Sequence, residues 1–123
     1  MNRFVNVEAT DEITLANGDK VMVRQRLTAE EDASLVRNLM RLSFDVSSGE
    51  AKVTEGDWHL QRLRICQTYV KGWNFTDNDG KEVLCGYGTI AKLDSDTVNE
   101  IAEAIDALQK TRKETFAKNA KRR

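Results

Sequence analysis

The sequence predicts a small α+β domain with an N-terminal β-hairpin, a central helix, a short second strand pair around Trp73 and a long C-terminal helix. Regions in which apolar residues alternate predict the strands, and regions in which they recur at three- and four-residue steps predict the helices. The length of 123 residues is that of one domain, and 40% apolar with 32% charged residues is typical of a globular chain. We expect a single domain over residues 1–109, followed by a basic, partly frayed helix end over residues 110–123.

The hairpin is predicted by Ile13, Leu15, Val21 and Val23, which alternate with other residues on either side of the sequence ANGD. These four side chains share one face only if the connection has an odd number of residues. A three-residue loop over 16–18, with its glycine in the left-handed conformation, meets this requirement.

A central helix is predicted to begin after Thr28, because Thr28 and Glu31 have the spacing of a capping box. Apolar residues then recur at helical steps, and we expect this stripe to pack on the hairpin. The stripe consists of Leu35, Val36, Leu39, Met40 and Phe44. Residues 45–57 are mostly small and polar and include glycine, so they predict a loop.

Residues 58–75 fit two patterns, because some of their apolar residues follow helical spacing and others roughly alternate. We expect a strand at the Trp73 end of this region. Asp77, Asp79 and Gly80 follow in the sequence TDNDG, which predicts a tight turn. The sequence KEVLC is then expected to return as a short second strand.

The long C-terminal helix is predicted from an apolar face that repeats at helical spacing. This face consists of Val98, Ile101, Ala102, Ile105 and Leu108. Capping oxygens are available in the sequence DSD at 94–96, and Thr97 with Glu100 offers a second capping box. Residues 110–123 contain seven basic residues and one acid, a charge of +6, so the other 109 residues carry −7. A basic arm on an acidic body can contact nucleic acid, an acidic partner or a second copy.

The sequence around Trp73 does not have the spacing of a metal or phosphate loop. An EF-hand with Gly80 at its sixth position would place Phe75 and Gly86 where carboxylate ligands are required. The sequence GYG at 86–88 lacks the lysine and hydroxyl residue of a P-loop. We therefore predict no metal site and no cofactor, and we interpret the aspartates as part of a turn.

Catalytic side chains are also scarce. His59 is the only histidine, and Cys66 and Cys85 belong to no motif for nucleophilic catalysis, so we predict a protein that is not an enzyme. The first twelve residues contain no apolar signal-peptide core, and no run approaches the ~20 apolar residues that span a bilayer. We therefore expect a cytosolic protein with two reduced thiols.

Three segments together resemble the small tail assembly chaperones of long-tailed bacteriophages. They are EITLANGDKVMVRQ, VKGWNFTDNDGKEV and LDSDTVNEIAEAIDALQK, and the resemblance covers residues 11–110. Its best marker is Trp73 followed by Asp77, Asp79 and Gly80. The resemblance implies a non-enzymatic protein of the host cytoplasm, without catalytic residues, that binds the tape measure protein while the tail is built. Tail tube subunits are a second partner that it implies.

A chaperone for a long amphipathic helix needs apolar surface bordered by charge. We expect such a partner-binding surface on the C-terminal helix. Its residues would be Ile101, Ile105, Leu108, Phe116, Lys110, Arg112 and Lys113. Packing in the core would account for Ile101, Ile105 and Leu108 equally well.

Two other functions are consistent with the sequence. A structural subunit of a phage tail or connector would have the same composition, but it would remain in the finished virion. A small nucleic-acid-binding protein would use the basic residues 110–123, although a solvated helix end accounts for the same charges.

Overall fold

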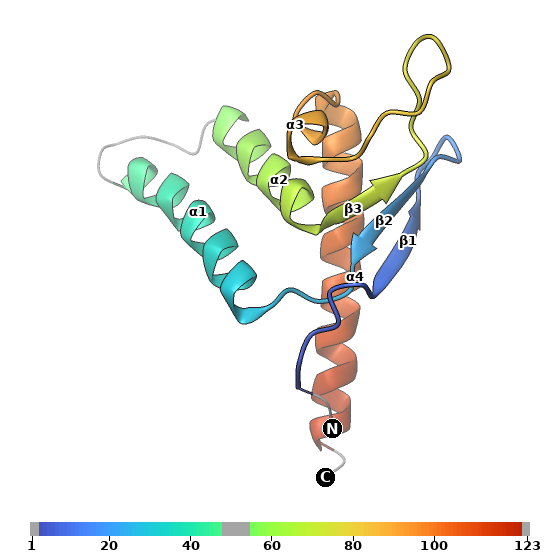
Figure 1. The fold of residues 1–123 in the computed structure, drawn as a ribbon. Helices are drawn as coiled ribbons and strands as arrows, with labels where there is room; N and C mark the ends of the chain where they lie inside the picture. Colours follow the sequence, from blue (N-terminus) through green and yellow to red (C-terminus); the bar gives the residue numbers. More distant parts are fainter. Residues whose placement is uncertain (1–2, 48–54, 122–123) are drawn as a thin grey trace.

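The computed structural model describes residues 3–47 and 55–121, and it describes side chains over 3–39 and 58–115. Three short strands and four helices make up these residues, as Figure 1 shows. In chain order they are β1 (Thr10–Thr14), β2 (Lys20–Arg24), α1 (Ala29–Ser47), α2 (Glu55–Tyr69), β3 (Val70–Trp73), α3 (Tyr87–Ile90) and α4 (Ser95–Lys121). The α+β class predicted from the sequence is therefore confirmed.

The predicted hairpin is formed by β1 and β2, which pair antiparallel with Ile13 opposite Val21. Gly18 has a φ of 92°, so it occupies the left-handed region that the three-residue loop requires. The Leu15 backbone N–H donates to the Asp19 carbonyl at 2.8 Å and closes this loop. All four apolar residues that predicted the hairpin are buried on one face.

The region over 58–75 contains both structures that its pattern allowed. Helix α2 continues to Tyr69, and the chain then passes directly into β3, so the strand expected near Trp73 is present. Strand β3 pairs antiparallel with β2 and completes one sheet of order β1-β2-β3. Strand β3 therefore belongs to the hairpin sheet, and the second strand pair expected around Trp73 is reduced to one antiparallel bridge, between Thr76 and Glu82.

The sequence after the aspartate-rich turn does not form the returning strand that we expected. It makes a single bridge between Thr76 and Glu82, and the turn is held by Asp77, whose Oδ1 accepts from the backbone N–H groups of Asp79 and Lys81. Gly80 has a φ of 78°, the left-handed conformation predicted for a turn glycine. Two backbone hydrogen bonds also join its arms, from the Asp77 N–H to the Lys81 carbonyl at 2.9 Å and from the Val83 N–H to the Phe75 carbonyl at 3.1 Å. The returning arm therefore pairs over a few residues only, without becoming a regular strand.

Trp73 holds this turn against the sheet. Its ring stacks on Phe75 with ring centroids 4.8 Å apart, and its indole N–H donates to the Val83 carbonyl at 2.7 Å. A tryptophan at the end of β3 therefore joins both arms of the turn.

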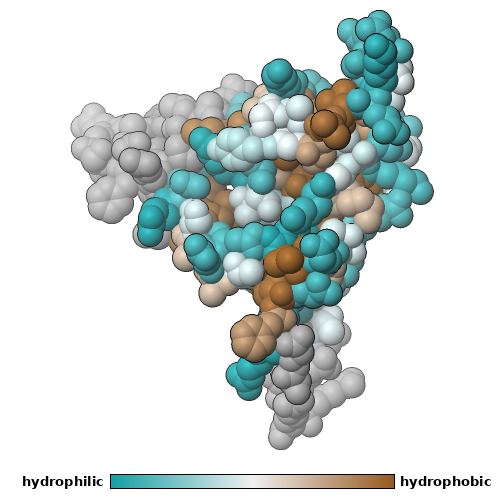
Figure 2. Space-filling view, in the orientation of Figure 1, coloured by the Kyte–Doolittle hydropathy of each residue, from teal (hydrophilic) through white to brown (hydrophobic). Residues whose placement is uncertain are grey.

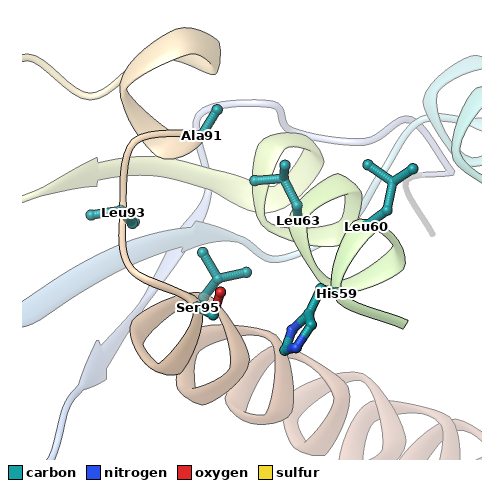
Figure 3. Close-up of a pocket in the computed structure, with 7 residues that line it drawn as sticks. His59, Leu60, Leu63, Ala91, Leu93 and Ser95 are labelled. Carbon is teal, nitrogen blue, oxygen red and sulfur yellow. The ribbon is translucent and has the colours of Figure 1, made fainter. Parts of the chain in front are cut away.

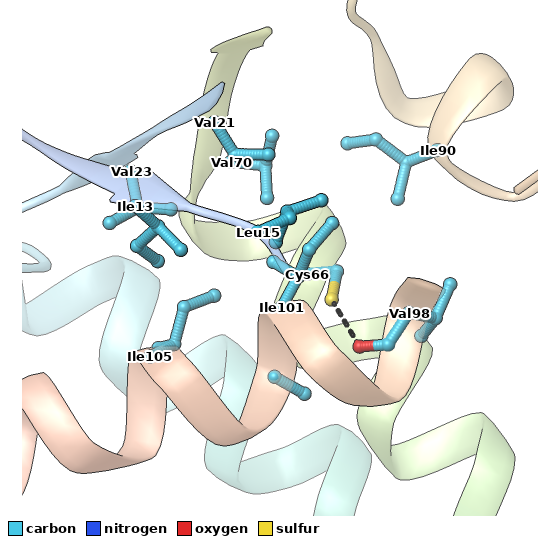
Figure 4. Packing of buried hydrophobic residues seen from close by; sticks show 11 residues of the cluster. Ile13, Leu15, Val21, Val23, Cys66, Val70, Ile90, Val98, Ile101 and Ile105 are labelled. Carbon is cyan, nitrogen blue, oxygen red and sulfur yellow. Dashed lines mark hydrogen bonds between the residues drawn. The ribbon is translucent and has the colours of Figure 1, made fainter. Parts of the chain in front are cut away.

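The core lies between the sheet and helices α2 and α4 (Figure 4). Its buried residues are Ile13, Leu15, Val21, Val23, Cys66, Val70, Ile90, Val98, Ile101, Ala102 and Ile105. The apolar face predicted for α4 supplies four of them, as many as the four residues that predicted the hairpin, and Leu108 packs at the edge of the core.

Helix α1 begins as predicted but packs elsewhere. The Thr28 hydroxyl accepts from the Glu31 N–H at 3.2 Å and the Glu31 carboxylate accepts from the Thr28 N–H at 3.0 Å, so the capping box is formed. The helix lies along α2, not on the hairpin as expected (Figure 1). Leu35 is buried but does not belong to the core cluster, and Val36 is exposed.

The range 45–57, which we predicted as a loop, is helical at both ends. Helix α1 extends through Ser47 and α2 begins at Glu55, so both ends of this range are helical. The remainder, residues 48–54, lies outside the described residues.

Helix α4 is capped by Asp94, whose carboxylate accepts from the Thr97 N–H at 3.2 Å and from the Thr97 hydroxyl at 2.6 Å. Thr97 therefore lies within the first turn and does not cap the helix. Glu100 accepts from the backbone N–H of Ala16 at 3.4 Å and so connects α4 to the hairpin loop.

The basic end of α4 is helical and projects from the body (Figure 1). The helix continues to Lys121. Arg112 holds the helix to the sheet, because its guanidinium donates to the Gln25 carbonyl and to the Asp11 carboxylate. Among the described residues, no helix is both long and apolar enough to cross a bilayer.

Candidate protein-docking surface

A pocket of about 250 Å³ lies where α2, the turn after α3 and the start of α4 meet (Figure 3). Helix α2 contributes three of its residues, the turn contributes two, and the first turns of α4 contribute two. They are His59, Leu60, Leu63, Ala91, Leu93, Ser95 and Val98. Five of the seven are apolar, and the imidazole and the hydroxyl are its polar groups. Such a pocket is large enough for one apolar side chain of a partner.

The capping of α4 positions the wall of this pocket. Because Asp94 accepts two hydrogen bonds from Thr97, the helix begins at Ser95, immediately after the turn that holds Leu93. The same hydrogen bonds lower the pKa of the Asp94 carboxyl below its usual value, so this cap is ionised at neutral pH. The short helix α3 ends in hydrogen bonds from Lys92 and Leu93 back into it, which fix the turn on the other side.

Two aromatic rings near the pocket are each held by an arginine of α2. The Arg62 guanidinium lies 4.9 Å from the centroid of the exposed Trp58 ring. Arg64 lies 5.8 Å from the Tyr87 ring and donates a hydrogen bond to its hydroxyl. Each contact combines a cation–π attraction with a restriction of the ring, so both rings are positioned before any partner arrives.

The segment around α3 exposes two large side chains. Leu84 is 89% exposed and Tyr87 is 62% exposed. Gln67 of α2 donates to the Tyr87 carbonyl at 3.1 Å, which ties this segment to the helix that lines the pocket. Figure 2 shows apolar surface beside α3 surrounded by hydrophilic residues. Exposed apolar groups of this kind are typical of protein-binding surfaces.

The partner-binding residues expected on α4 divide into two groups. Ile101 and Ile105 are fully buried in the core, so they are not surface residues and our expectation for them is corrected. Leu108 is half-buried against the same core. Lys110 and Lys113 are exposed, as a partner would require.

Two further residues of that expected surface also differ from it. The guanidinium of Arg112 is engaged by Asp11 and by a backbone carbonyl, so it stabilises the fold. The side chain of Phe116 lies outside those that the structure describes.

The side chains considered for catalysis are Cys66, Cys85 and His59. Burial raises the pKa of the Cys66 thiol to about 12, and this thiol donates to the Val98 carbonyl at 3.4 Å. Burial also raises the pKa of Cys85. Both thiols are free and protonated at neutral pH, which makes them poor nucleophiles. His59 lines the pocket with its ring against Trp58, at 5.2 Å between centroids.

The structural signature residues have conformational roles. Trp73, Asp77, Asp79 and Gly80 form the anchored turn described above, and one Asp77 oxygen is already used by two backbone donors. Among the side chains that the structure describes, over residues 3–39 and 58–115, no group of three or more metal-ligating residues is present.

Sequence reasoning missed the pocket and its two rings. Trp58 and Arg62 are four residues apart, a spacing that places two side chains on one face of a helix. Because residues 58–75 also fitted a strand pattern, the sequence did not predict this contact. We compared the chain with protein-family models, curated proteins and solved structures, and found no match in any of the three.

Proposed function

We propose that this protein is a non-enzymatic assembly chaperone of a long-tailed bacteriophage, which binds the tape measure protein in the host cytoplasm while the tail is built. Tail tube subunits are a second candidate partner. The proposal rests on the sequence resemblance around Trp73 and on one structural observation. That observation is an apolar pocket next to two exposed aromatic rings that arginines hold in place.

The composition of this surface supports a protein partner. Tryptophan, tyrosine and arginine are the residues that contribute most to binding energy in protein interfaces, and they do so around pockets that an apolar side chain fills. Trp58, Tyr87 and the two arginines have this arrangement beside the pocket. An amphipathic helix of the tape measure protein would present such a side chain at regular intervals.

Co-expression tests the proposal directly. The tape measure protein of the same phage should remain in the supernatant when this chain is present and should precipitate without it. Equal precipitation in both cases would refute the chaperone function. A structural subunit would instead be found in purified virions at high copy number, whereas a chaperone should leave the finished particle.

The pocket can be tested separately from the fold. Ala91 is exposed at the pocket wall with ordinary helical φ and ψ, so Ala91→Phe should fill the pocket without backbone strain. This variant should lose most of its ability to keep the partner in solution. Ala33→Phe, a matched change at an exposed position of α1, should behave like the unmodified chain. Equal activity of both variants would show that the partner binds elsewhere.

A further inference from the structure

Helix α4 has its charges segregated along its length. Residues 94–109 contain five acids and no basic residue, and residues 110–123 contain seven basic residues and one acid. The helix macrodipole favours acids in the first turn and basic residues in the last, but its influence does not extend beyond those turns. Glu103, Asp106, Lys110 and Lys113 lie in the middle of the helix, so the macrodipole does not explain their order.

These four residues form one exposed strip. Their spacing of three, four and three residues places them in succession along one side of the helix. All four are exposed, whereas Ile101 and Ile105 on the opposite side are buried in the core. Asp106 pairs with Arg62 at 2.8 Å and is still 57% exposed. Glu103, Lys110 and Lys113 have no ion-pair partner among the residues described.

We infer that two copies of this protein associate through the strip, with their α4 helices antiparallel. A two-fold axis midway between Asp106 and Lys110 places Glu103 of one copy opposite Lys113 of the other. It likewise places Asp106 opposite Lys110, and the symmetry produces each pair twice. A parallel arrangement in register would place like charges together, so the order of charges selects the antiparallel one.

The contact is electrostatic, and this determines its strength. Exposed ion pairs each contribute little, and the strip has no large apolar side chain at its centre, where Ala107 lies. The dimer is therefore weak and sensitive to salt. Its dissociation constant should rise about tenfold when NaCl increases from about 0.05 M to about 0.5 M, because the screening length falls below the separation of neighbouring pairs.

Charge reversal with mixing tests this inference. Lys113→Glu should remove self-association, because each copy then places Glu opposite Glu103 of the other. Glu103→Lys should remove it in the same way. An equimolar mixture of these two variants should restore a dimer, since both pairs become opposite in sign again. Sedimentation equilibrium at low salt measures all three samples.

A control and a fold check complete the experiment. Lys81→Glu reverses an exposed charge on the turn after β3, so it should leave self-association unchanged. Far-UV circular dichroism should show that all variants keep the helical content of the unmodified chain. The inference is overturned if the unmodified chain stays monomeric at low salt, or if the mixture associates no better than either variant alone. This result does not depend on the tape measure protein.

Discussion

The buried guanidinium of Arg24 provides the sharpest test of the contact between the end of β2 and the first turn of α1. Arg24 is 4% exposed at the end of β2, and it donates to Glu31 in the first turn of α1. Its Nε and Nη2 atoms are buried without a hydrogen-bond partner among the described residues. Among the described residues, the ion pair with Glu31 is the salt bridge that offsets the cost of burying this charge.

The change Glu31→Gln removes the charge while keeping the capping box, because a glutamine oxygen can still accept from the Thr28 N–H. Breaking a buried pair typically costs about 3–5 kcal/mol. The Glu31 side chain is 34% exposed, so water screens part of the interaction and we expect a smaller loss of about 2 kcal/mol. In a domain of this size, that loss should lower the midpoint of thermal unfolding by roughly 6–10 °C.

The change Arg24→Met should have a much smaller effect. It removes the buried charge and the two unpaired donors together and leaves an apolar side chain of similar length, so the free energy of unfolding should change by less than about 1 kcal/mol. Adding Glu31→Gln to Arg24→Met should then cost little more. Urea denaturation of the unmodified protein, the two single variants and the double variant gives the four free energies of unfolding of this double-mutant cycle. The assignment of a costly buried charge to Arg24 is wrong if Arg24→Met destabilises the protein more than Glu31→Gln does, or if the two effects simply add.

Three further predictions concern other parts of the molecule. Cys66, with its pKa raised to about 12, should react with a thiol reagent at pH 8 far more slowly than the less buried Cys85, and equal rates would contradict the burial of Cys66. Trp73→Phe keeps a ring against the turn but removes its hydrogen bond, so the free energy of unfolding should fall by about 1 kcal/mol in urea titrations. Asp94→Ala should cost about 1 kcal/mol at pH 7, because it removes the α4 cap. The folded-state pKa of Asp94 is depressed, so the stabilisation by this cap is fully present above the ordinary aspartate pKa of about 3.9. It is lost as the pH falls through the folded-state pKa. The unmodified protein and the Asp94→Ala variant should therefore differ less in stability at pH 2 than at pH 7.

The sequence predicted the elements whose structure depends on residues close together in the chain. The hairpin followed from alternation, because the residues that alternate are the ones that the core covers. The start of α1 followed from Thr28 and Glu31, whose contacts span only three residues. The packing of α1 on α2 could not be predicted from the sequence, because an apolar stripe specifies which face of a helix is buried but not which neighbouring element covers it.

The region over 58–75 shows a different limit. Its helical and alternating patterns overlap, because α2 passes into β3 without an intervening loop and Cys66 and Val70 both enter the same core. The pocket could not be predicted for a related reason. Its walls come from segments separated by about 30 residues, and only the packing of α2 against α4 brings His59 near Ser95.

The burial of α4 restricts how this protein can bind a partner. Offering the apolar face of α4 to a partner would require Val98, Ile101 and Ile105 to leave the core, at about 1.5–3 kcal/mol for each side chain. The sum is about 5–9 kcal/mol, which is comparable with the whole stability of a typical domain. The pocket, Trp58 and Tyr87 require no such opening, because they are already accessible and already held in place. A partner should therefore bind at this end of the molecule while the core half of α4 stays folded. Hydrogen exchange should then show that binding leaves the protection of α4 residues 101–105 unchanged.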